Sequence, residues 1–229
     1  NEFCSYPKAL DLNSGAAVAK ALFVVSPIGF ALAEQSSRDN HYMQMGQVAN
    51  AQQAIMEHQQ LQTTLRQYCP IICFPGDPEM PDSVFPNNVF ASTEGKIIIG
   101  HMRHPIRQQE AMRTDIRQFM TDVLQREEID LSTQPGICEL TGSLIIDRAR
   151  GIGFCGLSER CNEAGAIAMH HAFGLRATYL FDLSESEYHT NVVLSVLASR
   201  AVVIASSGFK DIASANAIAE FYSPNVIQL

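Results

Sequence analysis

The sequence lacks clusters of basic residues and has few charges of either sign. Charged residues make up 17% of its 229 residues, with 16 Lys and Arg against 24 Asp and Glu, which gives a net charge of −8. Because a phosphate backbone is bound by grouped Lys and Arg, this balance argues against a nucleic-acid partner. Hydrophobic residues make up 46%, which is ordinary for a globular protein with a substantial core.

Long apolar runs and metal-binding patterns are also missing. The longest apolar run, near residues 21–26, is far shorter than the roughly 20 residues that a membrane helix needs, so we expect no membrane partner. The six cysteines follow no ligand spacing, and His170 and His171 are adjacent, so they cannot share a helix face. We therefore expect no metal and no cofactor. Sparse cysteines without a secretory leader predict reduced thiols and a cytoplasmic location.

Both ends of the sequence look cut rather than natural. The chain starts at Asn1 without a Met, and it stops at Leu229 inside an apolar, strand-like run. We predict that residues 1–20 form an N-terminal arm, disordered or left over from cloning, and that residues 21–229 form the folded domain.

Strand-like and helix-like patterns alternate along this domain. Amphipathic spacing predicts helices at 45–67, 107–126, 162–173 and 211–222. Leu61 and Leu65 in the first helix, and Ile116, Met120, Val123 and Leu124 in the second, are predicted to face the core. Short apolar runs predict strands at 21–26, 71–74, 84–90, 96–100, 144–146, 152–155, 177–181, 192–196 and 201–205. A strand–strand–helix–strand unit thus recurs about every 50 residues, which predicts a repeated α/β architecture with small mixed sheets.

Three polar segments lie beside predicted strands and carry the candidate functional residues. These residues are Asp82, Asn87, Asn88, Glu139, Arg160, His189 and Asn191. Taken singly, each segment fits a structural role. Asn and Asp in turns usually bond to nearby backbone, isolated charges are mostly solvated, and a lone His at the start of a strand is more often structural than catalytic.

Together and in this order, the segments resemble the guanidino-group-modifying superfamily, which comprises arginine deiminases, dimethylarginine dimethylaminohydrolases and amidinotransferases. The resemblance is carried by Asp82-Ser83-Val84-Phe85 before a polar pair, Glu139 with Thr141-Gly142-Ser143, Gly156-Leu157-Ser158-x-Arg160, and His189-x-Asn191. The variants Pro86-Asn87-Asn88 and Tyr188-His189-Thr190-Asn191 are most similar to the citrulline-utilisation hydrolase type.

This resemblance implies a fold and roles for individual residues. The fold would be α/β, a five-bladed α/β propeller (pentein) of ββαβ modules, with about four modules present. His189 would be the general acid and base, Glu139 would bind the substrate nitrogens, and Arg160 and Arg107 would pair with the substrate's α-carboxylate. The remaining substrate-binding residues would be Asp82, Asn87, Asn88 and Asn191. The nucleophilic Cys would lie in a fifth module beyond Leu229, so that the 229 residues alone would be inactive.

The implied activity is hydrolysis of a C–N bond in a guanidino or ureido amino acid through a covalent Cys intermediate. Deiminases have acidic residues where this chain has Asn88 and Asn191. An amide both donates and accepts hydrogen bonds, which favours a neutral ureido group such as that of citrulline. Cys155 and Cys161 are expected to be structural. An amidinotransferase and a catalytically inactive binding protein remain alternatives, and a homodimer remains open.

Overall fold

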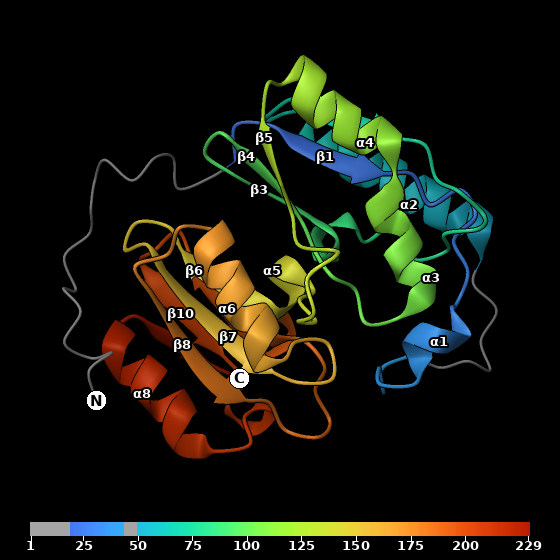
Figure 1. The fold of residues 1–229 in the computed structure, drawn as a ribbon. Helices are drawn as coiled ribbons and strands as arrows, with labels where there is room; N and C mark the ends of the chain where they lie inside the picture. The colour runs from blue at the N-terminus through green and yellow to red at the C-terminus, as the bar shows by residue number, and fades with distance from the viewer. Residues whose placement is uncertain (1–18, 44–49) are drawn as a thin grey trace. The chain divides into compact units, whose positions relative to one another are not determined.

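The computed structural model describes residues 19–43 and 50–229, which fall into two compact units (Figure 1). We call Ala19–Ser132 the N-terminal unit and Thr133–Leu229 the C-terminal unit. The predicted arm over residues 1–20 lies outside the described residues, apart from Ala19 and Lys20.

One module recurs along the chain, as the sequence predicted. It consists of an antiparallel hairpin, a helical segment, and a third strand that pairs in parallel with the second strand of the hairpin. The three complete copies among the described residues are β3 (Phe90–Thr93), β4 (Lys96–Ile99) and β5 (Glu127–Asp130); β6 (Leu144–Asp147), β7 (Ile152–Leu157) and β8 (Ala177–Asp182); and β9 (Leu194–Leu197), β10 (Ala201–Ile204) and β11 (Val226–Gln228). Their first strands start about 50 residues apart.

A fourth, partial module begins the N-terminal unit. Its strands β1 (Leu22–Val25) and β2 (Ile71–Phe74) pair in parallel and are joined through α2 (Ala51–Leu65). Val25 and Phe74 belong to the core of the unit, where Phe74 meets the rings of Phe23 and Phe119 edge to face. A short helix, α1 (Glu34–Ser37), lies between β1 and α2 in the sequence.

The inward face of α2 differs from the prediction. Leu61 is 50% exposed, whereas Gln62 is buried. Gln62 is stabilised there because its amide nitrogen lies 3.0 Å from His58 Nδ1 and 3.6 Å from Cys73 Sγ, and its oxygen accepts a hydrogen bond from Arg66. The part of the predicted helix over residues 45–49 lies outside the described residues.

The predicted strand over residues 84–90 is wrong except at its last residue. Pro86–Asn88 form a 3₁₀ turn, and β3 begins only at Phe90. Pro86 occupies the start of the turn, where its fixed φ and missing N–H are tolerated. Asn88 is thereby placed two residues before the first strand of its module.

The single helix predicted over 107–126 is instead a chain of short helical pieces. These are α3 (Pro105–Gln108), a 3₁₀ turn (Gln109–Met112), α4 (Thr114–Gln118) and a π turn (Phe119–Val123). Arg113 has extended backbone with φ −64° and ψ 98°, which ends the first half. Ile116 and Met120 are buried as predicted, but Val123 and Leu124 are 63% and 41% exposed.

Strand β5 was not predicted from the sequence, because three of its four residues are acidic and it has no apolar run. Glu128 and Asp130 alternate with a single apolar residue and would repel one another in isolation. Arg117 of α4 resolves this, since its Nε donates to Glu128 at 2.9 Å and its Nη2 donates to Asp130 at 2.7 Å. The strand therefore depends on a tertiary contact that no local pattern reveals.

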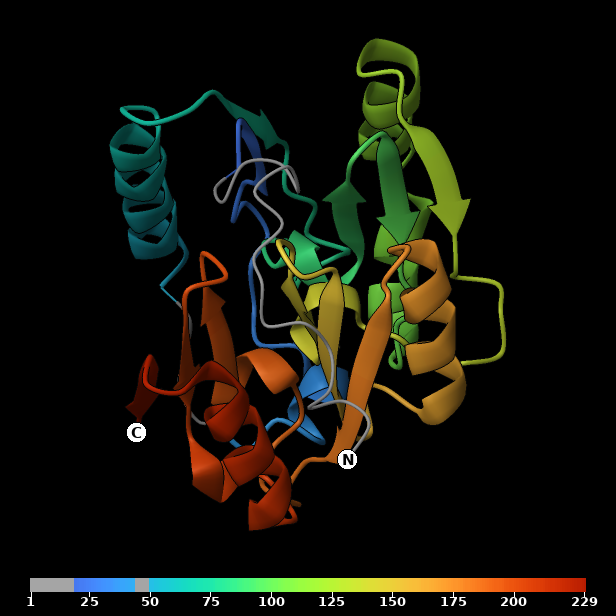
Figure 2. The ribbon, with the colours of Figure 1, turned by 90° about the vertical axis from the view of Figure 1, so that its left-hand side faces the viewer.

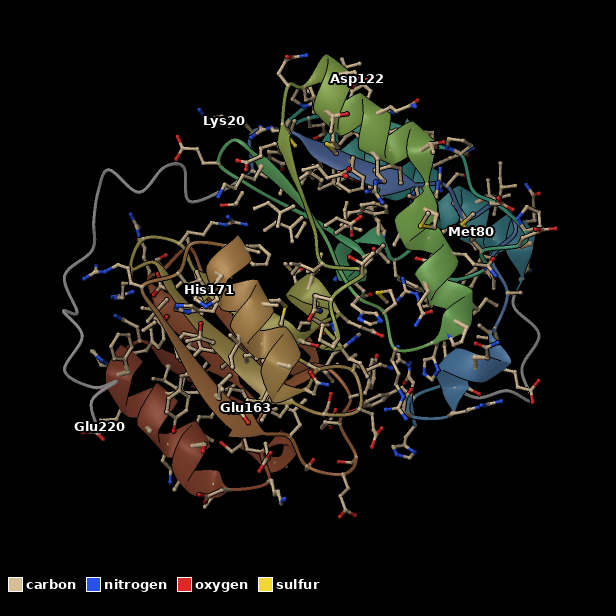
Figure 3. The ribbon with its side chains drawn as sticks, viewed as in Figure 1. Lys20, Met80, Asp122, Glu163, His171 and Glu220 are labelled. Carbon is tan, nitrogen blue, oxygen red and sulfur yellow. The ribbon has the colours of Figure 1, made fainter. Side chains whose placement is uncertain are left out.

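In the C-terminal unit, two longer helices cover the two sheets. α6 (Glu163–Ala172) packs on β7 and β8, and α8 (Ile212–Tyr222) packs on β10 (Figures 1 and 2). Asn162 and Asp211 cap them by accepting backbone N–H groups, as expected at helix starts. Glu163 lies in the first turn of α6, where its negative charge complements the helix dipole, and His171 lies near the other end of the helix (Figure 3).

Two very short helices complete this unit and matter for the site. α5 (Leu140–Ser143) runs directly into β6, and α7 (Thr190–Val193) runs directly into β9. The two helices lie against each other. A further 3₁₀ turn spans Ser206–Gly208. No helix within residues 19–43 and 50–229 has both the length and the hydropathy needed to cross a membrane.

Candidate active site

Three of the predicted polar residues lie near the start of successive modules, and Glu139 and His189 occupy the same place in theirs. Each lies in or just before the short helical turn that precedes the first strand. Asn88 ends the 3₁₀ turn before β3, Glu139 is the residue before α5, and His189 is the residue before α7. The module repeat therefore presents the position before the short helix twice in the C-terminal unit, once with a carboxyl group and once with an imidazole.

Glu139 and His189 are brought together although they lie 50 residues apart in the sequence. His189 Nε2 is 2.8 Å from Glu139 Oε2, and both side chains are buried. A carboxylate at this distance orients the ring and favours a proton on the ring nitrogen that it contacts. This is the relation between a general base and the group that orients it.

Arg160 completes the cluster and contacts the same carboxylate oxygen as His189. Its Nη1 lies 3.2 Å from Glu139 Oε2, and its side chain is 3% exposed. The Tyr188 ring stacks on this guanidinium, with 5.5 Å between Arg160 Cζ and the ring centroid. The buried negative charge of Glu139 is thus offset by a buried positive charge.

Asn191 lies on α7, two residues after His189, and its side chain is exposed. Its placement on the same short helix as Thr190, next to the Glu139–His189 pair, keeps it near the site within the C-terminal unit.

Two hydroxyl groups connect the backbone around His189 to its neighbours. Thr190 Oγ1 donates to the Ser143 carbonyl at 2.6 Å and accepts from the Gly156 N–H at 2.8 Å. Ser158 Oγ donates to the Tyr188 carbonyl at 2.7 Å and accepts from the Arg160 N–H. Sequence patterns did not single out either hydroxyl.

Three buried cysteines, Cys138, Cys155 and Cys161, lie in this unit. The sulfurs of Cys155 and Cys161 are 3.6 Å apart. The hydrogen bond with Cys155, burial and the charge of Glu139 together raise the pKa of the Cys161 thiol well above its usual range. A neutral, buried thiol is a poor nucleophile, so the burial of Cys155 and Cys161 agrees with the structural role expected for them.

In the N-terminal unit, Arg107 connects two of the predicted residues. Its Nη1 donates to Asn88 Oδ1 at 3.2 Å, and its Nη2 lies 3.4 Å from the Asp82 carbonyl. Its Nε and Nη2 also bind Glu110 in a bidentate ion pair, each at 2.9 Å. Sequence reasoning missed Glu110, although the i,i+3 spacing with Arg107 on a helical segment was an available signal.

Asp82 and Asn87 differ in their surroundings. The Asp82 side chain is buried and accepts a hydrogen bond from the hydroxyl of Ser36 in α1. Asn87, in contrast, is exposed. Within residues 19–43 and 50–229, no group of three or more His, Cys, Asp or Glu side chains is arranged to hold a metal ion.

Solved structures share this arrangement of modules. The N-terminal domain of ArgZ, an arginine dihydrolase from the ornithine–ammonia cycle in Cyanobacteria, superposes with a TM-score of 0.78 at 16% identity, over 90% of this chain and 74% of that one. A dimethylarginine dimethylaminohydrolase from Pseudomonas aeruginosa in complex with citrulline gives a TM-score of 0.69 at 20% identity, over 91% and 75% of the two chains. The protein therefore has the pentein α/β-propeller fold of the guanidino-group-modifying superfamily.

The family within that class follows from the sequence itself. Residues 26–222 match the family described as N,N dimethylarginine dimethylhydrolase, eukaryotic. The chain belongs to this family, whose members are hydrolases of guanidino groups. No curated protein sequence matches the chain.

Proposed function

We propose that the protein hydrolyses a C–N bond of a guanidino or ureido amino acid and that His189 is its general acid and base. The observation that supports this role best is the 2.8 Å contact between His189 Nε2 and Glu139 Oε2 in a buried cluster. In a family of guanidino-group hydrolases, such a pair can move protons next to a reacting carbon.

The nucleophile would come from a cysteine outside these 229 residues. A guanidino or ureido carbon is a poor electrophile, and a thiolate is needed to attack it. Cys155 and Cys161 are unsuited because both are buried and the pKa of Cys161 is raised. We therefore keep the proposal that a further module of the complete protein supplies this thiolate.

His189 would act twice in the reaction. As the thiolate attacks and a tetrahedral adduct forms, the imidazolium donates its proton to the departing nitrogen, and the C–N bond breaks. The neutral imidazole then takes a proton from water, which attacks the carbon of the covalent intermediate, and the C–S bond breaks to restore the thiolate. Glu139 would orient the ring and stabilise its charged form throughout.

The roles of the two arginines in binding the substrate's α-carboxylate remain predictions. Arg160 is engaged with Glu139, and Arg107 is engaged with Glu110. Binding a carboxylate would require each guanidinium to share donors with, or turn from, its acidic partner. The five N–H groups of an Arg make sharing feasible.

We further propose that the preferred substrate carries a neutral ureido group. An unpaired ion in a desolvated site costs several kcal/mol, so a cationic substrate needs negative charge around it. Here Arg160 offsets the charge of Glu139, and Asn88 and Asn191 are neutral, so that Asp82 is the one further negative charge among the predicted substrate-binding residues. Because Asn88 Oδ1 accepts from Arg107, the NH2 group of Asn88 is the end left to donate, and a ureido oxygen requires a donor.

The test compares kcat/KM for citrulline, arginine and N,N-dimethylarginine in the complete protein. We expect citrulline to be favoured, and we expect Asn88→Asp with Asn191→Asp to move the preference toward the cations. Asn225→Asp makes the same kind of substitution, and adds one negative charge, at an exposed position before β11, so this variant should keep the original ratio. His189→Ala should abolish turnover of every substrate.

Two results would count against these proposals. A native preference for arginine that the double variant does not increase would refute the charge argument alone. Undiminished turnover in His189→Ala would refute the proposed function itself. Transfer of the carbon group to an added acceptor amine in place of water would identify an amidinotransferase, and tight binding without turnover would identify an inactive binding protein.

A further inference from the structure

The hydroxyl of Thr190 lies at a junction of three segments. Thr190 is completely buried, follows His189 directly, and begins α7. Its Oγ1 donates to the carbonyl of Ser143, the last residue of α5, and accepts from the N–H of Gly156 in β7. Since Glu139 precedes α5, one hydroxyl joins the turn that carries the carboxylate to the turn that carries the imidazole.

A second hydroxyl holds the chain on the other side of His189. Ser158 Oγ donates to the carbonyl of Tyr188 at 2.7 Å and accepts from the N–H of Arg160 at 3.0 Å. The residues immediately before and after His189 are therefore both tied to the segment 156–160. That segment also carries Arg160, the ion-pair partner of Glu139.

The backbone at Gly156 shows how closely this junction is packed. A Cβ on Gly156 would lie 2.8 Å from Thr190 Oγ1 and 2.7 Å from Leu183 Cγ, closer than ordinary carbon contacts. Only glycine lets the Thr190 hydroxyl reach the backbone of β7 here. The hydrogen bond from the Gly156 N–H to Thr190 Oγ1 therefore requires both the hydroxyl on α7 and the absence of a side chain at Gly156 in β7.

We propose that Thr190 and Ser158 are positioning residues for His189. The two hydroxyls fix the backbone on each side of the imidazole and so hold Nε2 against Glu139. Neither hydroxyl contacts substrate in this assignment; both act through His189. The proposal rests on the proposed function for its effect on catalysis, but its effect on the imidazole can be measured without turnover.

The test uses Thr190→Val, which keeps the shape of the side chain and removes the hydroxyl. In the 229-residue chain at an alkaline pH where the imidazole is neutral, ¹⁵N NMR should show a single dominant tautomer for wild-type His189, with the proton on Nε2, because Glu139 binds that nitrogen. We expect a mixture of tautomers in Thr190→Val. Thr190→Ser restores the hydroxyl and should restore the wild-type pattern.

A matched control removes a threonine hydroxyl that lies beside another imidazole in the same unit. Thr178 Oγ1 lies 3.0 Å from His170 Nδ1, away from His189 in the sequence and on the sheet strand β8. Thr178→Val should therefore change the spectrum of His170 and leave that of His189 unchanged. If Thr190→Val fails to fold, Ser158→Ala takes its place, since Ser158 is only partly buried and its loss should shift the His189 tautomers in the same direction.

In the complete enzyme, Thr190→Val should lower kcat roughly 10- to 100-fold, because small misplacements of a reacting group are costly. KM should change less than about threefold, since the substrate-binding groups are untouched. An unchanged His189 spectrum in both Thr190→Val and Ser158→Ala would overturn the positioning role. A changed spectrum with full activity in those variants and in His189→Ala would leave the positioning intact and refute the proposed function.

Discussion

The buried ion pair between Glu139 and Arg160 allows a quantitative test of how the site is held. Their closest atoms, Oε2 and Nη1, are 3.2 Å apart. With an effective dielectric constant of about 20, two unit charges at this distance attract by about 5 kcal/mol before the cost of desolvation is subtracted. Removing one partner of such a pair leaves the other buried without its counter-charge, which typically destabilises by about 3–5 kcal/mol.

We expect Glu139→Gln and Arg160→Met each to destabilise the C-terminal unit by about 3 kcal/mol. The double variant should be less destabilised than the sum of the two, by about 1–3 kcal/mol, because no uncompensated charge remains. Native-state hydrogen exchange of the β7 amides, Ile152–Leu157, reports on this unit, since β7 is the central strand of its sheet.

The refuting result is additivity within about 0.5 kcal/mol. Additive effects would mean that Arg160 and Glu139 are each stabilised mainly by other groups. In that case the charge of Glu139 is not offset by Arg160, and the preference for a neutral substrate loses its electrostatic basis. The same measurement therefore tests a structural contact and the premise of the substrate proposal.

Two further outcomes are expected. Gly165→Ala should destabilise the C-terminal unit by more than about 3 kcal/mol in urea unfolding, because the new Cβ would lie 1.8 Å from the backbone oxygen of residue 137. Gly174→Ala should cost only about 1 kcal/mol, because a Cβ there meets open space and only the positive φ of +63° is unfavourable. Burial alone would raise the pKa of Asp130, but hydrogen bonds from Ser132 and Arg117 and the Arg117 charge lower it. Because the folded pKa lies below the unfolded value of roughly 3.9, this stabilisation is present above about pH 4 and disappears as the pH falls through the folded pKa. Asp130→Asn should therefore flatten the loss of stability between pH 5 and pH 2 by a measurable margin in denaturant titrations, and an unchanged slope would contradict the assignment.

The fold could be predicted where local patterns and packing agree. The hairpin β6–β7 and the helices α6 and α8 lie where apolar spacing placed them, because their cores are formed by their own apolar faces. The prediction failed where tertiary contacts decide. Strand β5 depends on Arg117, and the predicted helix over 107–126 breaks at the extended residue Arg113.

The candidate site shows a similar division. The order of the motifs predicted Glu139 and His189 as catalytic residues, and the structure places their side chains in contact. The ion pair of Arg160 with Glu139 and the hydroxyl of Thr190 were not foreseen, because both act across segments that are far apart in sequence. Contacts of this kind depend on the register of one module against the next, which single-sequence patterns do not encode.

The uneven burial of the cysteines makes the two units chemically distinguishable. Among the described cysteines, Cys69 and Cys73 of the N-terminal unit are partly or fully exposed, whereas Cys138, Cys155 and Cys161 of the C-terminal unit are buried. An alkylating reagent will therefore modify the first pair in the native protein and reach the other three only when the C-terminal unit opens. The labelling rate of those three thiols, followed by mass spectrometry, therefore measures how often the unit that holds His189 opens.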